Sequence, residues 1–186
     1  MRLTLCLMIL LVLFAAAGAS CAASDAYYVK KIGNEVYYST SSWPDENSNA
    51  TKVDSIKAAI EIANAGGEVY IAAGEYKITQ TITLKPGVKL YGGFDASTEN
   101  TPTDRKFENV TSIDADGSNC RVIECTDSST NNAETRLDGF VITGGYITKK
   151  GSEGGTGAGM YNENTSLVIA NCVFTGNKLT GIVREL

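Results

Sequence analysis

Histidine is absent from the 186-residue sequence, and its five cysteines include no Cys-x-x-Cys pair. A mixed zinc site made of cysteine and histidine is therefore excluded. The sequence also lacks a cluster of basic residues, and its 21 acidic side chains outnumber the 16 basic ones. This acidic balance argues against nucleic acid as a partner, and it gives the chain no attraction to an anionic membrane surface.

The long apolar run Leu3–Phe14 lies at the N-terminus and is interrupted only by Thr4. Arg2 precedes the run and small residues fill positions 15–20, an order typical of a secretory signal peptide. The run is shorter than the roughly 20 residues that a membrane-spanning helix needs. We therefore expect residues 1–20 to be a signal peptide and the chain to be exported.

Cys21 directly follows the small residues Gly18, Ala19 and Ser20. A bacterial lipoprotein signal also ends in small residues and a cysteine, although it usually has leucine at the position that Gly18 takes here. Two outcomes stay open. Lipidation of Cys21 would anchor the N-terminus to a membrane, whereas ordinary cleavage near Ala19 or Ala23 would leave no anchor.

Residues 27–38 predict two short strands, Tyr27–Lys30 and Glu35–Tyr38, joined by a turn at Gly33-Asn34. A polar loop over residues 39–49 follows and holds the only tryptophan, Trp43. An exposed tryptophan can stack on a sugar, but more often this side chain pins a loop to the body of the protein. Pinning is the favoured interpretation.

A helix is predicted over Val53–Ala65, with Asp54 as its N-cap. Apolar residues recur at helical spacing and would share one face: Val53, Ile56, Ala59, Ile60 and Ala63. Gly66 and Gly67 would end the helix. One amphipathic helix ahead of many strands is suited to cover the open apolar end of a stack of strands.

After this helix, short apolar pieces alternate with turn residues. The predicted strands are Glu68–Ala72, Thr81–Leu84, Val88–Tyr91, Thr111–Ile113, Arg121–Cys125 and Leu137–Ile142. Because no further helix is predicted between them, an α/β fold with helical crossovers is excluded. A solenoid, a sandwich or a barrel remains.

Residues 154–177 combine a glycine run, two short apolar pieces and a final Gly-Asn, as one coil of a β-solenoid does. Part of this pattern occurs twice, since residues 137–145 match 169–177 at an offset of 32 residues. Two mismatches exchange glycine for asparagine: Gly139 for Asn171 and Gly145 for Asn177. Both residue types adopt the left-handed conformation readily, so we expect the exchange to preserve a turn. A hairpin at Asp138-Gly139 is the alternative.

Several stretches resemble the bacterial right-handed parallel β-helix proteins of the pectin-lyase-like superfamily. They are Gly-Gly-Glu-Val-Tyr-Ile-Ala-Ala-Gly-Glu-Tyr at 66–76, Lys-Pro-Gly-Val-Lys-Leu-Tyr-Gly-Gly-Phe at 85–94, Asn-Val-Thr at 109–111, Asp-Ala-Asp-Gly at 114–117 and Leu-Asp-Gly-Phe at 137–140. Gly-Ala-Gly-Met at 157–160 and Phe-Thr-Gly-Asn at 174–177 are similar to the paired motifs of polymorphic outer-membrane protein repeats. The resemblance spans residues 27–178.

The expected fold is therefore all-β: a right-handed parallel β-helix (solenoid) with a short N-terminal capping helix. We expect a signal peptide over 1–20, N-terminal strands and a polar loop over 21–50, and the capping helix with the first coils over 51–186. Because proteins of the resembled family continue with more coils and an end cap, we expect the chain to be truncated at its C-terminus.

Enzymes of the resembled superfamily act on acidic polysaccharides. Hydrolases of the polygalacturonase type use a histidine, which this chain lacks. Lyases of the pectate type use Ca²⁺ held by carboxylates, together with a basic residue. The nearest candidates are Asp114, Asp116, Asp127 and Asp138 with Arg121 or Arg136. The Asp-Gly pairs at 116–117 and 138–139 are better explained as turns, so we assign no catalytic, cofactor or metal residue.

Three cysteines lie in the body of the chain: Cys120, Cys125 and Cys172. Their odd number and irregular spacing do not indicate a disulfide framework. We expect them to be small apolar residues inside the coils, and a Cys120–Cys125 disulfide stays possible.

The expected function is that of an exported, surface-associated, adhesin-like protein, located extracellularly or at the outer-membrane surface. It would bind a polysaccharide or a cell-surface protein without catalysis and without a cofactor. The alternatives are a carbohydrate-active lyase and a fragment of a longer surface protein with no function of its own.

Overall fold

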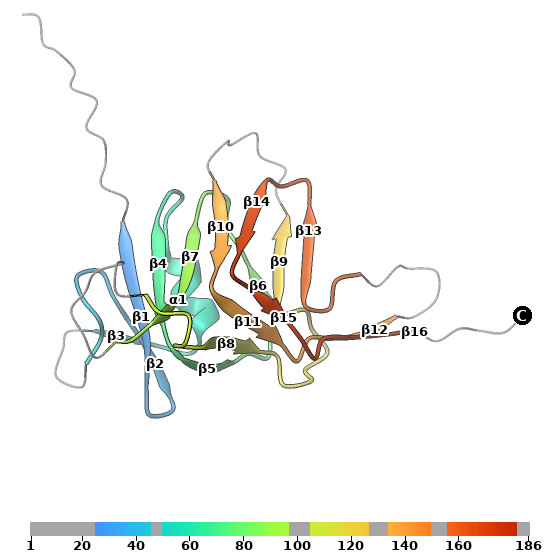
Figure 1. Ribbon diagram of the computed structural model, residues 1–186, viewed down its shortest axis with the longest axis horizontal. Helices are drawn as coiled ribbons and strands as arrows, with labels where there is room; N and C mark the ends of the chain where they lie inside the picture. Colours follow the sequence, from blue (N-terminus) through green and yellow to red (C-terminus); the bar gives the residue numbers. More distant parts are fainter. Residues whose placement is uncertain (1–24, 46–49, 97–104, 127–133, 150–155, 182–186) are drawn as a thin grey trace, which may run out of the picture.

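A computed structural model describes residues 25–45, 50–96, 105–126, 134–149 and 156–181. These residues form mostly β-strands with one short helix, and several of the sheets are parallel (Figure 1). Within these ranges, no helix is long and apolar enough to cross a membrane. The predicted signal peptide and Cys21 lie outside the described residues.

The described strands make four sheets. The seven-stranded sheet contains β14 (Leu167–Ala170), β10 (Thr135–Asp138), β7 (Lys89–Phe94), β4 (Glu68–Ala72), β1 (Ala26–Ile32), β2 (Glu35–Ser39) and β3 (Thr51–Val53), in this spatial order. The four-stranded sheet contains β15 (Val173–Phe174), β11 (Phe140–Thr143), β8 (Thr111–Asp114) and β5 (Gly74–Lys77). The other two contain β13 (Met160–Glu163), β9 (Ile123–Thr126) and β6 (Ile82–Thr83), and β12 (Tyr146–Lys149) with β16 (Lys178–Gly181).

The N-terminal strands form the predicted hairpin. β1 and β2 pair antiparallel, with Ile32 opposite Glu35, and Gly33 adopts a φ of 61° in the turn between them. β1 also pairs with β4 in parallel. The seven-stranded sheet is therefore parallel from β14 to β1, and β2 and β3 extend it with antiparallel strands.

The helix α1 spans Ile56–Ile62, which is shorter than predicted. Its N-cap is Ser55 and not Asp54, because the Ser55 hydroxyl accepts a hydrogen bond from the Ala58 backbone nitrogen at 3.2 Å. Val53 belongs to β3, opposite Val36, and the helix therefore begins only after the chain leaves this strand.

The predicted apolar face of α1 lies in the core, where Ile56, Ala59 and Ile60 are buried. The chain leaves the helix at Ala63, ahead of the two glycines that were expected to end it. The helix packs against β2, β3 and β6, and therefore lies at the N-terminal end of the stacked strands.

From β4 onward the chain contributes strands to the seven-, four- and three-stranded sheets in a repeating order, and we call one such round a pass. β4, β5 and β6 lie in the seven-, four- and three-stranded sheets, and β7, β8 and β9 repeat that order. The next pass consists of β10, β11 and β13, with β12 inserted before β13, and β14 and β15 begin another. All pairs between these passes are parallel.

The sequence match between residues 137–145 and 169–177 corresponds to strand pairing, because residues that are 32 positions apart lie opposite each other in neighbouring strands. Leu137 lies opposite Ile169 in one sheet and Val141 opposite Val173 in the next. The single predicted strand over 137–142 is divided at Gly139, because β10 and β11 belong to different sheets. The alternative hairpin at Asp138-Gly139 is therefore wrong.

Inward-facing side chains of successive passes align into the core. Val69 pairs with Leu90, and Leu90 with Leu137, and all three are fully buried. Cys125 is also buried among these apolar residues, while Cys120 and Cys172 pack against them, as expected. No disulfide joins these three cysteines.

Only one of the two glycine-to-asparagine exchanges preserves a left-handed turn. Gly139 and Asn171 have φ values of 85° and 50°, as expected. Gly145 and Asn177 have no positive φ, so that part of the prediction is wrong. Asn177 instead accepts a hydrogen bond from the Gly145 nitrogen at 2.9 Å and donates to the Ile142 carbonyl at 2.8 Å. The asparagine at position 177 thus provides a side-chain amide that bonds backbone groups of the preceding pass.

Candidate binding groove at the corner between two sheets

A groove of about 420 Å³ lies at the corner where the seven-stranded sheet gives way to the four-stranded sheet. Its lining comes from segments far apart in sequence: Gly93, Phe107, Asn109, Val110, Thr111, Gly139, Phe140, Val141, Asn171, Cys172 and Val173. Most of these side chains are apolar, and the polar ones are two asparagines and a threonine. The groove therefore combines an apolar surface with a small number of hydrogen-bonding groups, as ligand sites commonly do.

Left-handed backbone shapes the corner in three successive passes. Gly93, Gly139 and Asn171 have φ values of 92°, 85° and 50°. Gly139 also leaves space, because a Cβ added there would lie 1.8 Å from a terminal nitrogen of Arg105. The glycine is therefore needed both for the turn and for the passage of the Arg105 side chain.

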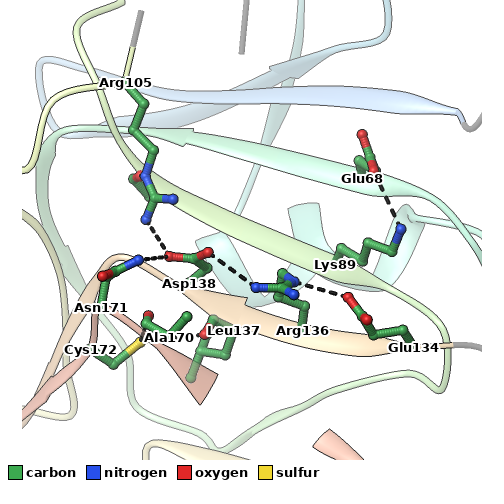
Figure 2. Close-up of polar contacts among 11 residues, drawn as sticks. Glu68, Lys89, Arg105, Glu134, Arg136, Leu137, Asp138, Ala170, Asn171 and Cys172 are labelled. Carbon is green, nitrogen blue, oxygen red and sulfur yellow. Dashed lines mark hydrogen bonds and ion pairs between the residues drawn. The ribbon is translucent and has the colours of Figure 1, made fainter. Parts of the chain in front are cut away.

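An ion-pair network beside the groove is centred on Asp138, which is 6% exposed (Figure 2). One carboxylate oxygen accepts hydrogen bonds from Arg105 at 2.7 Å and from the Asn171 amide at 2.9 Å. The other oxygen accepts from Arg136 at 3.4 Å, and Arg136 in turn pairs with Glu134 at 3.0 Å. Of the three partners of Asp138, Arg105 comes from a loop, Arg136 from β10 and Asn171 from the turn after β14.

The pKa of Asp138 lies below its ordinary value of 3.8. Burial by itself would raise this pKa, but the hydrogen bonds from Arg105 and Asn171 and the charges of Arg105 and Arg136 outweigh it. Asp138 is therefore ionised at neutral pH. Because both of its oxygens already accept hydrogen bonds, it serves to position Arg105 and Asn171 and is poorly suited to act as a free base.

Arg105 ties the loop before β8 to the seven-stranded sheet. Besides pairing with Asp138, its Nε donates a hydrogen bond to the Gly92 carbonyl at 2.7 Å. Its guanidinium carbon also lies 4.9 Å from the centre of the Phe107 ring, within the range of a cation–π contact. The ring is thereby held at the groove although it remains 66% exposed.

Around Phe107, Val110 and Val173 are each 55% exposed and make the rim of the groove apolar. Within the described residues, the side-chain nitrogen of Asn109 is a buried donor without a hydrogen-bond acceptor. The groove therefore offers an apolar ring and an apolar rim.

The aspartates considered for a calcium site are not brought together. Asp114 accepts a hydrogen bond from the Asp116 nitrogen at 2.7 Å, and Asp116 has a φ of 48° and pairs with Lys77 at 3.1 Å. These contacts confirm the predicted turn at 114–117. Asp127 lies outside the described residues, and the described part of the chain contains no group of three or more potential metal-ligating side chains.

The two arginines considered as bases have structural partners instead. Arg121 donates to the Thr156 carbonyl at 3.1 Å and lies over the Tyr161 ring at 4.7 Å. Arg136 pairs with Glu134 and Asp138. Among the sequence candidates that the structure describes, only Asp138 and Arg136 form an ion pair with each other.

Trp43 is buried, at 8% exposure, and packs against the outer side of the seven-stranded sheet. Its ring centre lies 5.4 Å from that of Tyr28 and 5.6 Å from that of Phe94. The prediction that it pins the polar loop is confirmed, and its burial leaves no open ring for a sugar.

Compared with models of known protein families, with curated proteins and with solved structures, the chain gives no match. The groove therefore has to be interpreted from its own residues. Sequence reasoning did not single out Arg105 or Phe107, because their segment carries no periodic pattern, and Asn109 entered only through the Asn-Val-Thr stretch of the resemblance. An arginine two residues before an isolated aromatic residue is the signal that this segment offers.

Proposed function

We propose that the chain is an exported, surface-associated protein that binds a glycan without catalysis, with the corner groove as its contact site. The observation that carries the proposal is the exposed Phe107 ring, which Arg105 holds at the edge of the groove. A fixed aromatic ring can stack on the apolar face of a sugar at a low cost in conformational entropy. Asn109 and Asn171 add polar side chains to the lining of the groove.

The proposed architecture is a right-handed parallel β-helix capped by α1. It is supported by the rotation of the chain through the sheets and by parallel pairing at a constant offset of 32 residues in the last passes. The right hand follows from the general preference of parallel β-connections. Export is supported by the N-terminal sequence alone.

A binding role also agrees with the way the charged residues are used. In the ion-pair network, the carboxylate of Asp138 is occupied by Arg105, Asn171 and Arg136. A lyase of the type implied by the resemblance would need carboxylates that can give up such partners to a calcium ion. Binding through the groove needs no such change.

The test is a glycan array probed with the full chain, the Phe107→Ala variant and the Ile62→Ala variant. Ile62 is an exposed apolar residue of α1, at 38% exposure, and serves as the matched control. We expect binding to a restricted set of glycans, an affinity about tenfold lower for Phe107→Ala, which corresponds to about 1.4 kcal/mol, and no change for Ile62→Ala.

Equal binding by the Phe107→Ala variant would remove the groove from the proposal, and a blank array would contradict glycan binding. Binding to a cell-surface protein instead would support the protein-binding alternative. Formation of unsaturated uronides from polygalacturonate with Ca²⁺ would contradict the non-enzymatic proposal.

A further inference from the structure

The described residues that line the corner groove carry no full charge. They are glycines, apolar residues, one threonine, two asparagines and a cysteine. Burial raises the pKa of the Cys172 thiol, which is therefore uncharged at neutral pH. The Thr111 hydroxyl accepts a hydrogen bond from the Gly93 nitrogen at 2.8 Å and thereby serves the fold. A ligand in the groove would meet apolar groups and amide dipoles.

The charged side chains beside the groove are paired with each other. Arg105 and Asp138 lie 2.7 Å apart, and their side chains are only 15% and 9% exposed. Lys106 and Glu108 flank Phe107 in the sequence and lie 3.9 Å apart, at 65% and 77% exposure, where solvent screens them. An anionic ligand could gain Arg105 only by taking it from Asp138, and this would leave a nearly buried carboxylate without that partner.

A carboxylate on a ligand would also be opposed by the rest of the groove. Its charge would lose hydration against the apolar side chains of Phe107, Val110 and Val141. The formal net charge of −5 on the chain adds a repulsion that any polyanion would have to overcome. Both effects act against acidic glycans at this site.

A neutral sugar meets the same groove without these costs. Its C–H face can stack on the Phe107 ring, which carries no charge to be matched. Asn171, which donates through its side-chain nitrogen to Asp138 at 2.9 Å, also has a carbonyl oxygen. This oxygen is a hydrogen-bond acceptor, which suits a sugar hydroxyl and does not suit a carboxylate.

We infer that the glycan recognised by the corner groove is a chain of neutral hexoses and not of uronic acids. The inference rests on the proposed function and names the class of ligand for the same site. It departs from the acidic polysaccharides that the family resemblance implies, because the described lining of the groove contains no cation to receive their carboxylates.

The test uses pairs of oligosaccharides that share a linkage and differ only at C6, where one member has a hydroxymethyl group and the other a carboxylate. Oligosaccharides of glucose, mannose and galactose are each matched with the uronate of the same linkage. Calorimetric titration of the full chain measures the affinities. We expect the neutral member of at least one pair to bind about tenfold more tightly than its uronate, with an affinity that is independent of the NaCl concentration.

A cation placed at the groove should change this preference. Val110 is 55% exposed at the rim, so Val110→Lys should fold normally and should bind the uronates about tenfold more tightly than the wild type does. Ile62→Lys adds the same charge on α1, away from the groove, and we expect no such gain. Equal gains for both variants, or no gain for Val110→Lys, would count against the inference, because the groove would then not set the preference.

The outcomes separate this inference from the proposed function. Tighter binding of a uronate that Phe107→Ala weakens would overturn the neutral ligand and leave glycan binding at the groove standing. Binding of glycans on the array but of no neutral hexose chain would have the same meaning. The absence of all glycan binding, or binding that Phe107→Ala leaves unchanged, would contradict the proposed function and this inference with it.

Discussion

At the residue scale, Gly139 and Asn171 occupy equivalent positions of two passes but make different contacts. Both lie at the same corner with positive φ, one pass apart. Gly139 has to lack a side chain because Arg105 crosses directly over it. Asn171 carries a side chain at the same corner, and its amide reaches back to Asp138. A repeat can therefore keep its backbone while its side chains serve different contacts.

Gly139→Ala should destabilise the protein more than Gly117→Ala. Both glycines have positive φ, but a Cβ at Gly117 would meet nothing within 4 Å. Gly117→Ala should cost about 1–2 kcal/mol for the left-handed conformation. Gly139→Ala should cost about 2 kcal/mol more, because the Arg105 side chain has to move away from Asp138 and lose a charged hydrogen bond. Urea unfolding measures both, and equal costs would show that Arg105 does not depend on this glycine.

At the scale of single elements, α1 shows the limits of a cap prediction. Asp54 and Ser55 are both good N-cap residues, and the helix pattern alone does not choose between them. The backbone of Ser55 decides the choice, because it is extended, with φ −164° and ψ 164°, and the helix therefore begins only at Ile56. The cap was thus set by the backbone conformation at Ser55, which the helix pattern does not record.

Ser55→Ala should lower the free energy of unfolding by about 1 kcal/mol, because the Ala58 nitrogen loses its hydrogen bond. Asp54→Ala should have a smaller effect, since Asp54 is not the cap. Thermal unfolding of the two variants measures the difference. A larger loss for Asp54→Ala would show that the helix begins one residue earlier in solution.

At the scale of the whole molecule, the Asp138 network joins three passes. Arg105 comes from the loop after β7, Asp138 from β10 and Asn171 from the turn after β14. Because Asp138 is nearly buried, its charge contributes to global stability only while these partners compensate for its desolvation. The network therefore links the pH to the stability of the stacked passes.

Asp138→Asn should lower the stability at pH 7 by about 2 kcal/mol, because the variant loses charged hydrogen bonds. The pKa of Asp138 is lowered by folding, so its stabilisation is present above the ordinary pKa of 3.8 and is lost as the pH falls through the folded value. The difference between wild type and variant should therefore shrink below about pH 3.8.

Urea unfolding at pH 7, 5 and 2.5 measures this difference, with Glu108→Gln as the control. Glu108 has a side chain that is 77% exposed, and its substitution should change little at any of these pH values. A difference for Asp138→Asn that stays constant down to pH 2.5 would show that its carboxylate does not contribute as a charge.

The sequence by itself determined the local features of the fold. Strand positions followed from short apolar pieces between turn residues and the β1–β2 turn from Gly33-Asn34. The offset of the last passes followed from the match between 137–145 and 169–177. These features depend on residues close in sequence or on a repeat that preserves the pattern. The mostly β, parallel-strand architecture was predictable for this reason.

Only the tertiary structure decided the corner groove and the ion pairs. Arg105 and Asp138 lie 33 residues apart, and Arg105 belongs to a loop whose composition does not indicate a partner. The use of Asn177 as a side-chain bridge likewise depends on the preceding pass, whose Gly145 nitrogen it bonds. Contacts between passes are set by how the strands stack in space, and no local pattern of residues records which loop side chain reaches across a given corner.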